Sequence, residues 1–339
     1  MPIGIAALKI ARRIFFGCFF VAGVAVAAPT YPLKPVLVVV PYPKGGGPDR
    51  LVRLIAKRME VELGQPLRVE NRPGMSGILG VAEVARAAPD GYTVGYVNNI
   101  TQSYAEVTHD RLIYRPDDLE PIVLLLRVAD GIAVPADSNI ASLGDLMRLS
   151  QRAPGRVTYT TPGRGASSNL SASLLARGAG MQWQYKPAAD SFQARALIEK
   201  GDANVLVDNV TMLLPQVREG KLRVLATTGA QRSGLLPDAP TLLESTSAGV
   251  VNFGWGGLVA PAGTPPNIVT RLNAAANKAL SDSRTVQALR AMGAEAAGGE
   301  AEQLRTAARK ERALWSSLEK PSPGRGRPAT GQPVRRNIP

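Results

Sequence analysis

The sequence contains very little cysteine and histidine. Among its 339 residues, Cys18 is the single cysteine and His109 the single histidine. One cysteine cannot form an internal disulfide, and the chain has no evident Cys–His or Ser–His–Asp set for nucleophilic catalysis. No group of His, Cys, Asp and Glu has the spacing of a metal site, and His109 in its polar segment is interpreted as a surface residue. We therefore predict neither an enzyme nor a metal or other cofactor.

Aromatic residues are also few, at 5% of the chain, and they do not alternate with Lys and Arg. This leaves no stacking platform for single-stranded nucleic acid, so no nucleic-acid partner is predicted. The formal net charge is +13, but seven cations lie near the two ends, which leaves about +6 on the remaining body. A basic body of this kind favours anionic solutes as ligands. The seven terminal cations are Lys9, Arg12, Arg13, Arg325, Arg327, Arg335 and Arg336.

The two ends have patterns of their own. The cations at the start are followed by the apolar block IFFGCFFVAGVAVA and by small residues, which is the three-part pattern of a secretory signal peptide. We expect cleavage near Ala27, with residues 1–27 removed and the mature protein exported, and we interpret Cys18 as part of this signal. Residues 321–339 contain five prolines and almost no apolar residues, so this basic tail is predicted to be disordered.

Between these ends, apolar β-branched runs alternate with segments of helical periodicity. A chain of this length accommodates two domains of about 120 to 150 residues, and the alternation predicts an α/β fold with mostly parallel sheets flanked by helices. Strands are predicted at 36–40, 67–70, 91–97, 121–129, 131–136, 203–209 and 222–229, and helices at 168–179, 212–218, 267–280, 282–292 and 300–319.

Two of the strand-to-helix connections are rich in glycine: PYPKGGGPDR at 41–50 and TPGRGASSN at 161–169. Neither has the arrangement of a nucleotide-hydrolase phosphate loop or of the dinucleotide fingerprint. Glycines allow backbone N–H groups to converge, and a helix N-terminus adds roughly half a positive charge. Each loop is therefore either an ordinary connection or one side of a clamp for a small anion. Asp208, at the end of a strand, either caps the next helix or contacts the ligand.

Several longer motifs carry a resemblance: YPLKPVLVVVPYPKGGGPD, LGQPLRVENRPGMSG, APDGYTV, VLVDN, GKLRVLATTGAQRSGLLPDAPT and GLVAPAGTPPNIVTRLNAAANKAL. Over residues 31–318 the chain resembles the periplasmic solute-binding receptors of tripartite tricarboxylate transporters, often called Bug receptors. The resemblance implies a monomeric Venus-flytrap protein with residues 31–132 plus 256–320 in one domain and 133–255 in the other. Such a receptor binds a small organic carboxylate in the periplasm and delivers it to membrane permease subunits.

The resemblance also implies which residues contact the ligand. The chain departs from the family pattern at Pro48, Ala166 and Asn169, which replace two hydroxyl residues and a histidine. Lys44 and Arg164 add a cation beside each loop, which suggests a ligand with more than one negative charge unless both side chains are solvated. Asn99 belongs to the same polar segment as Asn98. The predicted ligand-binding residues are Tyr42, Lys44, Gly45, Gly46, Gly47, Asp49, Asn98, Thr101, Gly163, Arg164, Gly165, Ala166, Ser167, Ser168 and Asp208.

Two alternatives stay open at this point. The first is a receptor that reports its ligand to a sensor protein instead of a transporter. The second is an exported hydrolase of an acidic substrate, with Ser167 or Ser168 as the nucleophile, although the sequence shows no base for either serine.

Overall fold

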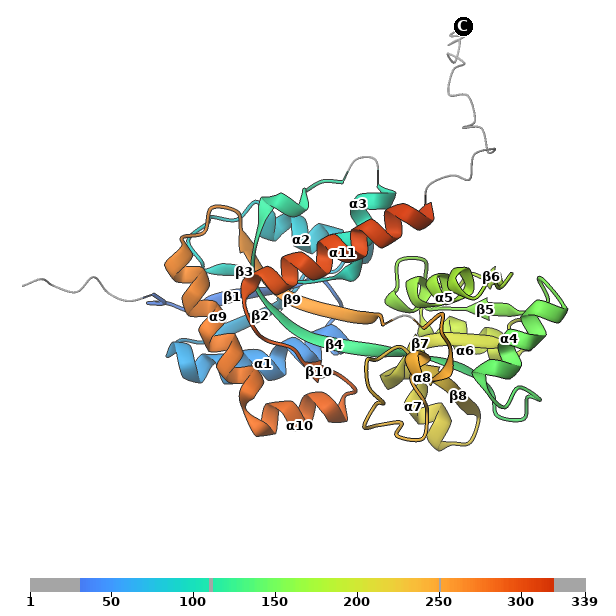
Figure 1. The fold of residues 1–339 in the computed structure, drawn as a ribbon. Coiled ribbons are helices and arrows are strands. Elements are labelled where there is room, and N and C mark those ends of the chain that lie inside the picture. The colour runs from blue at the N-terminus through green and yellow to red at the C-terminus, as the bar shows by residue number, and fades with distance from the viewer. Residues whose placement is uncertain (1–30, 110–111, 250, 320–339) are drawn as a thin grey trace, which may run out of the picture. The chain divides into compact units, whose positions relative to one another are not determined.

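The computed structural model describes residues 31–109, 112–249 and 251–319. The predicted signal peptide and basic tail lie outside these residues. Within the described ranges, every helix is too short or too polar to cross a membrane. The chain folds as an α/β protein whose strands and helices follow the order expected from the sequence (Figure 1).

One part of the sheet contains the N-terminal strands. β1 pairs in parallel with β2 on one side and β3 on the other, and β3 pairs antiparallel with β9. Val36, Val38 and Val40 of β1 are buried against Leu51 and Ile55 of helix α1, which is the packing that the uninterrupted valine run predicts. The elements here are β1 (Val36–Val40), α1 (Gly47–Leu63), β2 (Leu67–Asn71), α2 (Ile78–Ala85), β3 (Thr93–Asn98), β9 (Phe253–Pro261), α9 (Pro266–Ser281), α10 (Ser283–Ala291), β10 (Glu295–Ala296) and α11 (Ala301–Glu319).

The other part of the sheet contains the middle of the chain. β5 pairs in parallel with β6 and β7, and a second core gathers Ile132, Leu146, Leu175 and Val207. The capping box of Ser142 and Asp145 starts one of its helices. The elements are α4 (Leu143–Arg152), β5 (Thr158–Thr160), α5 (Ser167–Gly178), β6 (Gln184–Lys186), α6 (Ser191–Glu199), β7 (Val205–Asn209), α7 (Val210–Arg218), β8 (Leu222–Thr227) and α8 (Leu242–Ser245).

A single long strand, β4 (Leu119–Pro135), belongs to both parts (Figure 1). Residues 119–129 pair antiparallel with β9, and residues 130–135 pair antiparallel with β7 or β8. The sheet is therefore mixed, because the long strands add antiparallel pairs to the expected parallel ones. The sequence-based division of this segment into strands at 121–129 and 131–136 is wrong. Asp130, the polar residue between the two runs, forms its hydrogen bonds inside the protein and does not end the strand.

Candidate functional site

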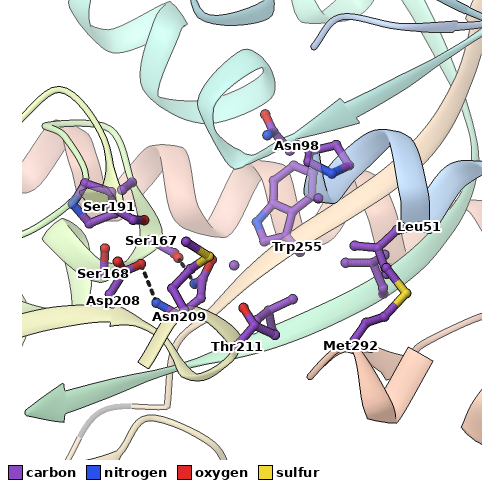
Figure 2. Close-up of a pocket in the computed structure, with 18 of the residues that line it drawn as sticks. Leu51, Asn98, Ser167, Ser168, Ser191, Asp208, Asn209, Thr211, Trp255 and Met292 are labelled. Carbon is purple, nitrogen blue, oxygen red and sulfur yellow. Dashed lines mark hydrogen bonds between the residues drawn. The ribbon is translucent and has the colours of Figure 1, made fainter. Parts of the chain in front are cut away.

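A cavity of about 760 Å³ is lined by residues from both parts of the sheet. The beginnings of α1, α5 and α7 and the ends of β3 and β7 all contribute to its wall. Figure 2 shows Ser167, Ser168, Asp208 and Asn209 together on one side of this cavity. The cavity thus lies at the carboxyl ends of parallel strands, where open α/β sheets usually bind ligands.

Three helices begin at the cavity wall without a side-chain cap among the described residues. The residues before them are Gly46, Ala166 and Asn209. Glycine and alanine have no side-chain acceptor, and the Asn209 amide donates instead to Asp130 Oδ1, at 2.6 Å. The first N–H groups of these helices thus lack the usual capping acceptor, and each helix end carries a partial positive charge. This combination favours a bound anion.

Ser168 adds a hydroxyl to the same wall. Its side chain is 1% exposed, and its buried Oγ has no hydrogen-bond partner among the described residues. The neighbouring Ser167 differs, because its Oγ donates to Asp130 Oδ1 at 3.0 Å. A buried hydroxyl without a partner is costly, so Ser168 is suited to bond a ligand at this position.

Two buried carboxyl groups lie behind and beside these serines. Asp130 is fully buried and accepts hydrogen bonds from Ser167, Ser171 and Asn209, yet burial raises the pKa of its carboxyl to about 6. Burial also raises the pKa of Asp208 to about 7, and the nearby Asp130 carboxylate adds to this shift. Asp208 lines the cavity. Its raised pKa favours a neutral carboxyl group that can donate a hydrogen bond.

The first glycine loop is held from behind by Asp49. The Asp49 carboxylate accepts from the Gly45 N–H at 2.8 Å, from Arg53 Nε at 2.9 Å and from Asn71 Nδ2 at 2.9 Å. Burial opposes ionisation of Asp49, but these bonds and the Arg53 charge outweigh it and hold its pKa below the usual value. Asp49 therefore fixes the loop at the start of α1 and does not line the cavity.

Asn98, at the end of β3, is held in a similar way. Its Nδ2 donates to the Tyr42 hydroxyl at 2.8 Å, and its backbone N–H donates to Thr101 Oγ1 at 3.1 Å. Tyr42 and Thr101 thus position Asn98, which lines the cavity. Next to it, Asn99 donates from Nδ2 to the Gly165 carbonyl at 3.1 Å and connects β3 with the second glycine loop.

Gly165 needs to be glycine for two reasons. Its φ is +146°, and a Cβ at this position would collide with the ring of Tyr104. The ring belongs to the helical turn Ile100–Tyr104, which follows β3. The second loop can therefore approach the end of β3 only where it has no side chain.

The predicted ligand-binding residues fall into two groups. Six line the cavity: Gly47, Asn98, Ala166, Ser167, Ser168 and Asp208. Of the others, Lys44 is exposed, and the Arg164 guanidinium lies 5.4 Å from the centre of the Tyr185 ring. Those that support the wall or lie outside it are Tyr42, Lys44, Gly45, Gly46, Asp49, Thr101, Gly163, Arg164 and Gly165.

Several residues of the wall are not among the predicted ligand-binding residues. Arg50 and Leu51 follow the first loop directly and could have been included with it. Met212 lies two residues into α7, and Trp255 lies in β9. Met292, at the end of α10, has no local signal because only the tertiary fold brings it to the cavity.

Among the described residues, no group of three or more His, Cys, Asp and Glu side chains could hold a metal ion. The His109 ring contacts the Ala105 carbonyl and the Thr108 hydroxyl. Ser167 bonds Asp130 directly, without an intervening imidazole.

The chain is similar to several known proteins over most of its length. The chain is similar to the protein encoded in the tcbD–tcbE intergenic region of Pseudomonas sp. strain P51, with 33% identity over 311 residues, covering 88% of this chain and 92% of that protein. Among solved structures it is similar to MatC from Rhodopseudomonas palustris with bound malate, with 30% identity, a TM-score of 0.70, and coverage of 85% of this chain and 99% of that one. A second R. palustris protein, solved with adipate, has 29% identity and a TM-score of 0.74, covering 86% of this chain and 98% of that one.

The family model described as the tripartite tricarboxylate transporter family receptor matches residues 51–320. This agrees with the resemblance predicted from the sequence motifs, and the solved structures similar to this chain include the periplasmic binding protein BugD and a TctC solute-binding protein from Polaromonas. The chain therefore belongs to the tripartite tricarboxylate transporter receptor family.

Proposed function

We propose that this protein is a periplasmic receptor that binds a small organic carboxylate in the cavity and delivers it to the membrane permease of a tripartite transporter. One observation carries the proposal: three uncapped helix N-termini and the unpartnered Ser168 hydroxyl converge on one cavity. Backbone N–H groups and a hydroxyl are donors that fit a carboxylate. Family members solved with malate and adipate support the same ligand class.

We further propose that the receptor closes on its ligand as two domains, 31–132 plus 256–320 and 133–255. The long strands support this division, because β4 changes pairing partners at Asp130 and β9 begins at Phe253. Of the predicted residues, Gly47, Ala166, Ser167, Ser168, Asn98 and Asp208 would face the ligand. Tyr42, Asp49, Thr101 and Gly165 would hold them in place. The protein would perform no chemical reaction on its solute.

The test of this proposal is isothermal titration of the purified protein with malate, adipate, hexanoate and benzoate. We expect at least one acid to bind, and Ser168→Ala to weaken its binding about ten- to hundredfold, because a hydrogen bond to a charged group is worth about 1.5 to 3 kcal/mol. Ser150→Ala is the matched control, since Ser150 Oγ is also buried without a partner but lies outside the cavity. If no acid binds, the proposed ligand class is wrong. If Ser168→Ala binds the acid as tightly as Ser150→Ala does, the proposed position of the carboxylate beside Ser168 is wrong.

Delivery to a permease needs a test in cells. Deleting the gene should abolish uptake of the acid identified by titration, and restoring wild-type protein should recover it. Uptake that persists at the wild-type rate would favour a receptor that signals to a sensor protein.

A further inference from the structure

The two sides of the cavity differ in chemistry. Figure 2 shows Ser167, Ser168 and Asp208 on one side and Leu51 and Met292 on the other. The polar side is where α5 and α7 begin. Of the described residues that line the cavity, Arg50 and Asp208 are the only ones of the types Arg, Lys, His, Asp and Glu, and burial raises the pKa of the Tyr96 hydroxyl, which keeps it neutral. A ligand that fills both sides therefore meets hydrogen-bond donors at one end and mostly hydrocarbon at the other.

The apolar side comes from several separate elements. Leu51 belongs to α1, Val128 to β4, Met212 to α7 and Met292 to the end of α10, while Leu235 lies after β8. Val128, Leu235 and Met292 pack against the cores and are only partly buried. Met212 is 40% exposed although it is a large apolar residue. These side chains offer apolar surface that a suitable ligand would remove from water.

A close contact builds part of this apolar wall. Gly293 follows Met292 and has a φ of +74°, and a Cβ there would collide with Thr211 Cγ2 and lie 3.2 Å from Leu235 Cδ1. The end of α10 therefore packs directly on the start of α7 and on the segment after β8. This packing brings Met292 close to Leu235 and to the start of α7, whose Met212 also lines the cavity.

The free-energy cost of burying a charged group differs between the two sides of the cavity, and this difference favours one class of ligand over another. A carboxylate at the polar side replaces its lost water with N–H groups and the Ser168 hydroxyl. A second carboxylate beside Leu51, Val128 and Met292 would lose hydration against hydrocarbon, because the Ser168 hydroxyl and the uncapped starts of α5 and α7 lie on the other side. Arg50 lines the cavity, but its side chain is exposed, so solvent screens its charge.

Resting on the proposed carboxylate-receptor function, we infer that the solute is a monocarboxylate with an apolar body, aliphatic or aromatic. Its carboxylate faces the start of α5, and its body lies against Leu51, Met212, Leu235 and Met292. This replaces the hypothesis of a multiply charged ligand, which relied on Lys44 and Arg164. Neither of these two side chains lines the cavity.

The experiment compares acids that differ only in the second carboxylate: hexanoate with adipate, and benzoate with terephthalate. Isothermal titration of the full protein should show at least tenfold tighter binding of the monocarboxylate in one or both pairs. Met212→Gln and Met292→Gln should each weaken that monocarboxylate at least fivefold. Leu243→Gln is the control, because Leu243 is exposed and lies outside the cavity, and it should bind as the wild type does.

The alternative results have distinct meanings. If the dicarboxylate binds as tightly as its partner or more tightly in both pairs, the protein is a carboxylate receptor but the inferred apolar body is wrong. If both methionine variants bind the monocarboxylate as well as the control does, the apolar wall does not contact the ligand. If none of the four acids binds, and malate also fails, the proposed function fails together with the inference.

Discussion

Asp208 makes the cavity sensitive to pH. Its carboxyl group is buried beside Ser168 and Asn209, and burial raises its pKa to about 7. When neutral, Asp208 can donate a hydrogen bond to a bound carboxylate, and when ionised it repels one. The sequence placed Asp208 at a strand end, but its burial depends on packing that no local pattern contains.

This predicts that a monocarboxylate binds more tightly at pH 6 than at pH 8. The dissociation constant should rise by up to about tenfold per pH unit above 7, because each pKa unit corresponds to about 1.4 kcal/mol. Asp208→Asn should remove this dependence, whereas Asp137→Asn, at an exposed site outside the cavity, should keep it. Titration at pH 6, 7 and 8 measures the effect. Equal wild-type affinity at all three values would contradict it.

The structure also explains the three residues that depart from the family pattern, Pro48, Ala166 and Asn169. Pro48 lacks an N–H and fits the first turn of α1, where that group would have no helical partner. Ala166 precedes α5 and removes the hydroxyl that would otherwise cap it. Asn169 is buried and contributes a hydrogen bond to Tyr159 instead of lining the cavity. Of the three substitutions, only Ala166 therefore leaves helix donors free at the cavity, because Pro48 has no N–H and Asn169 lies outside the wall.

At the scale of elements, the sequence predicts the strands and helices well, because the apolar pattern that identifies each of them lies within its own segment. The predicted strand at 36–40 matches β1, and the predicted helix at 168–179 matches α5 within a residue at each end. The sequence also predicts that both glycine loops converge, because each loop follows a strand and the carboxyl ends of parallel strands lie at the same edge of a sheet. The apolar wall could not be predicted, because α10 reaches the cavity only through its packing on α7.

Asp49 gives a prediction about one element, the first loop with helix α1. Asp49→Asn should lower the free energy of unfolding by about 1 to 3 kcal/mol, because the carboxylate accepts three hydrogen bonds and pairs with Arg53. The pKa of Asp49 is lower in the folded protein than its unfolded value of 3.8. This contribution to stability is therefore fully present when the pH is above 3.8 and is lost as the pH falls through the pKa of the folded state. Urea unfolding at pH 7 measures the loss.

The control for this variant is Asp238→Asn, because Asp238 is exposed. It should unfold within about 0.5 kcal/mol of the wild type, as surface substitutions usually do. Should Asp49→Asn match the control, the loop would not depend on the carboxylate network.

At the scale of the whole molecule, buried carboxyl groups gather where the long strands change partners. Asp130 lies in β4 at this point. Glu311 of α11 accepts from Trp255 Nε1 of β9 at 2.5 Å and from Trp315 Nε1 at 3.3 Å. Burial raises the pKa of Glu311 to about 7, with Asp130 to about 6 and Asp208 to about 7. Folding therefore favours the protonated form of all three groups.

The sign of the resulting pH dependence follows from these values. Their unfolded values are 3.8 for the aspartates and 4.5 for Glu311, so between pH 5 and 7 the folded chain holds more protons than the unfolded chain. Stability should fall as pH rises through this window and level off above about pH 8, where all three groups are ionised in both states. The lowered pKa of Asp49 acts below this window and does not reverse the trend.

Thermal unfolding at pH 5, 6, 7 and 8 should therefore show a midpoint that falls on the order of 5 °C or more between pH 5 and 7 and falls less steeply from pH 7 to 8. Glu311→Gln removes one titrating group and keeps an acceptor for the tryptophan N–H groups, so its midpoint should fall less steeply over the same range. Its matched control is Glu302→Gln on the exposed side of α11, which should follow the wild-type curve. A wild-type midpoint that rises from pH 5 to 7 would show that the three carboxyl groups are ionised in the folded protein. A Glu311→Gln curve parallel to the wild-type curve would show that Glu311 does not contribute to the pH dependence of stability.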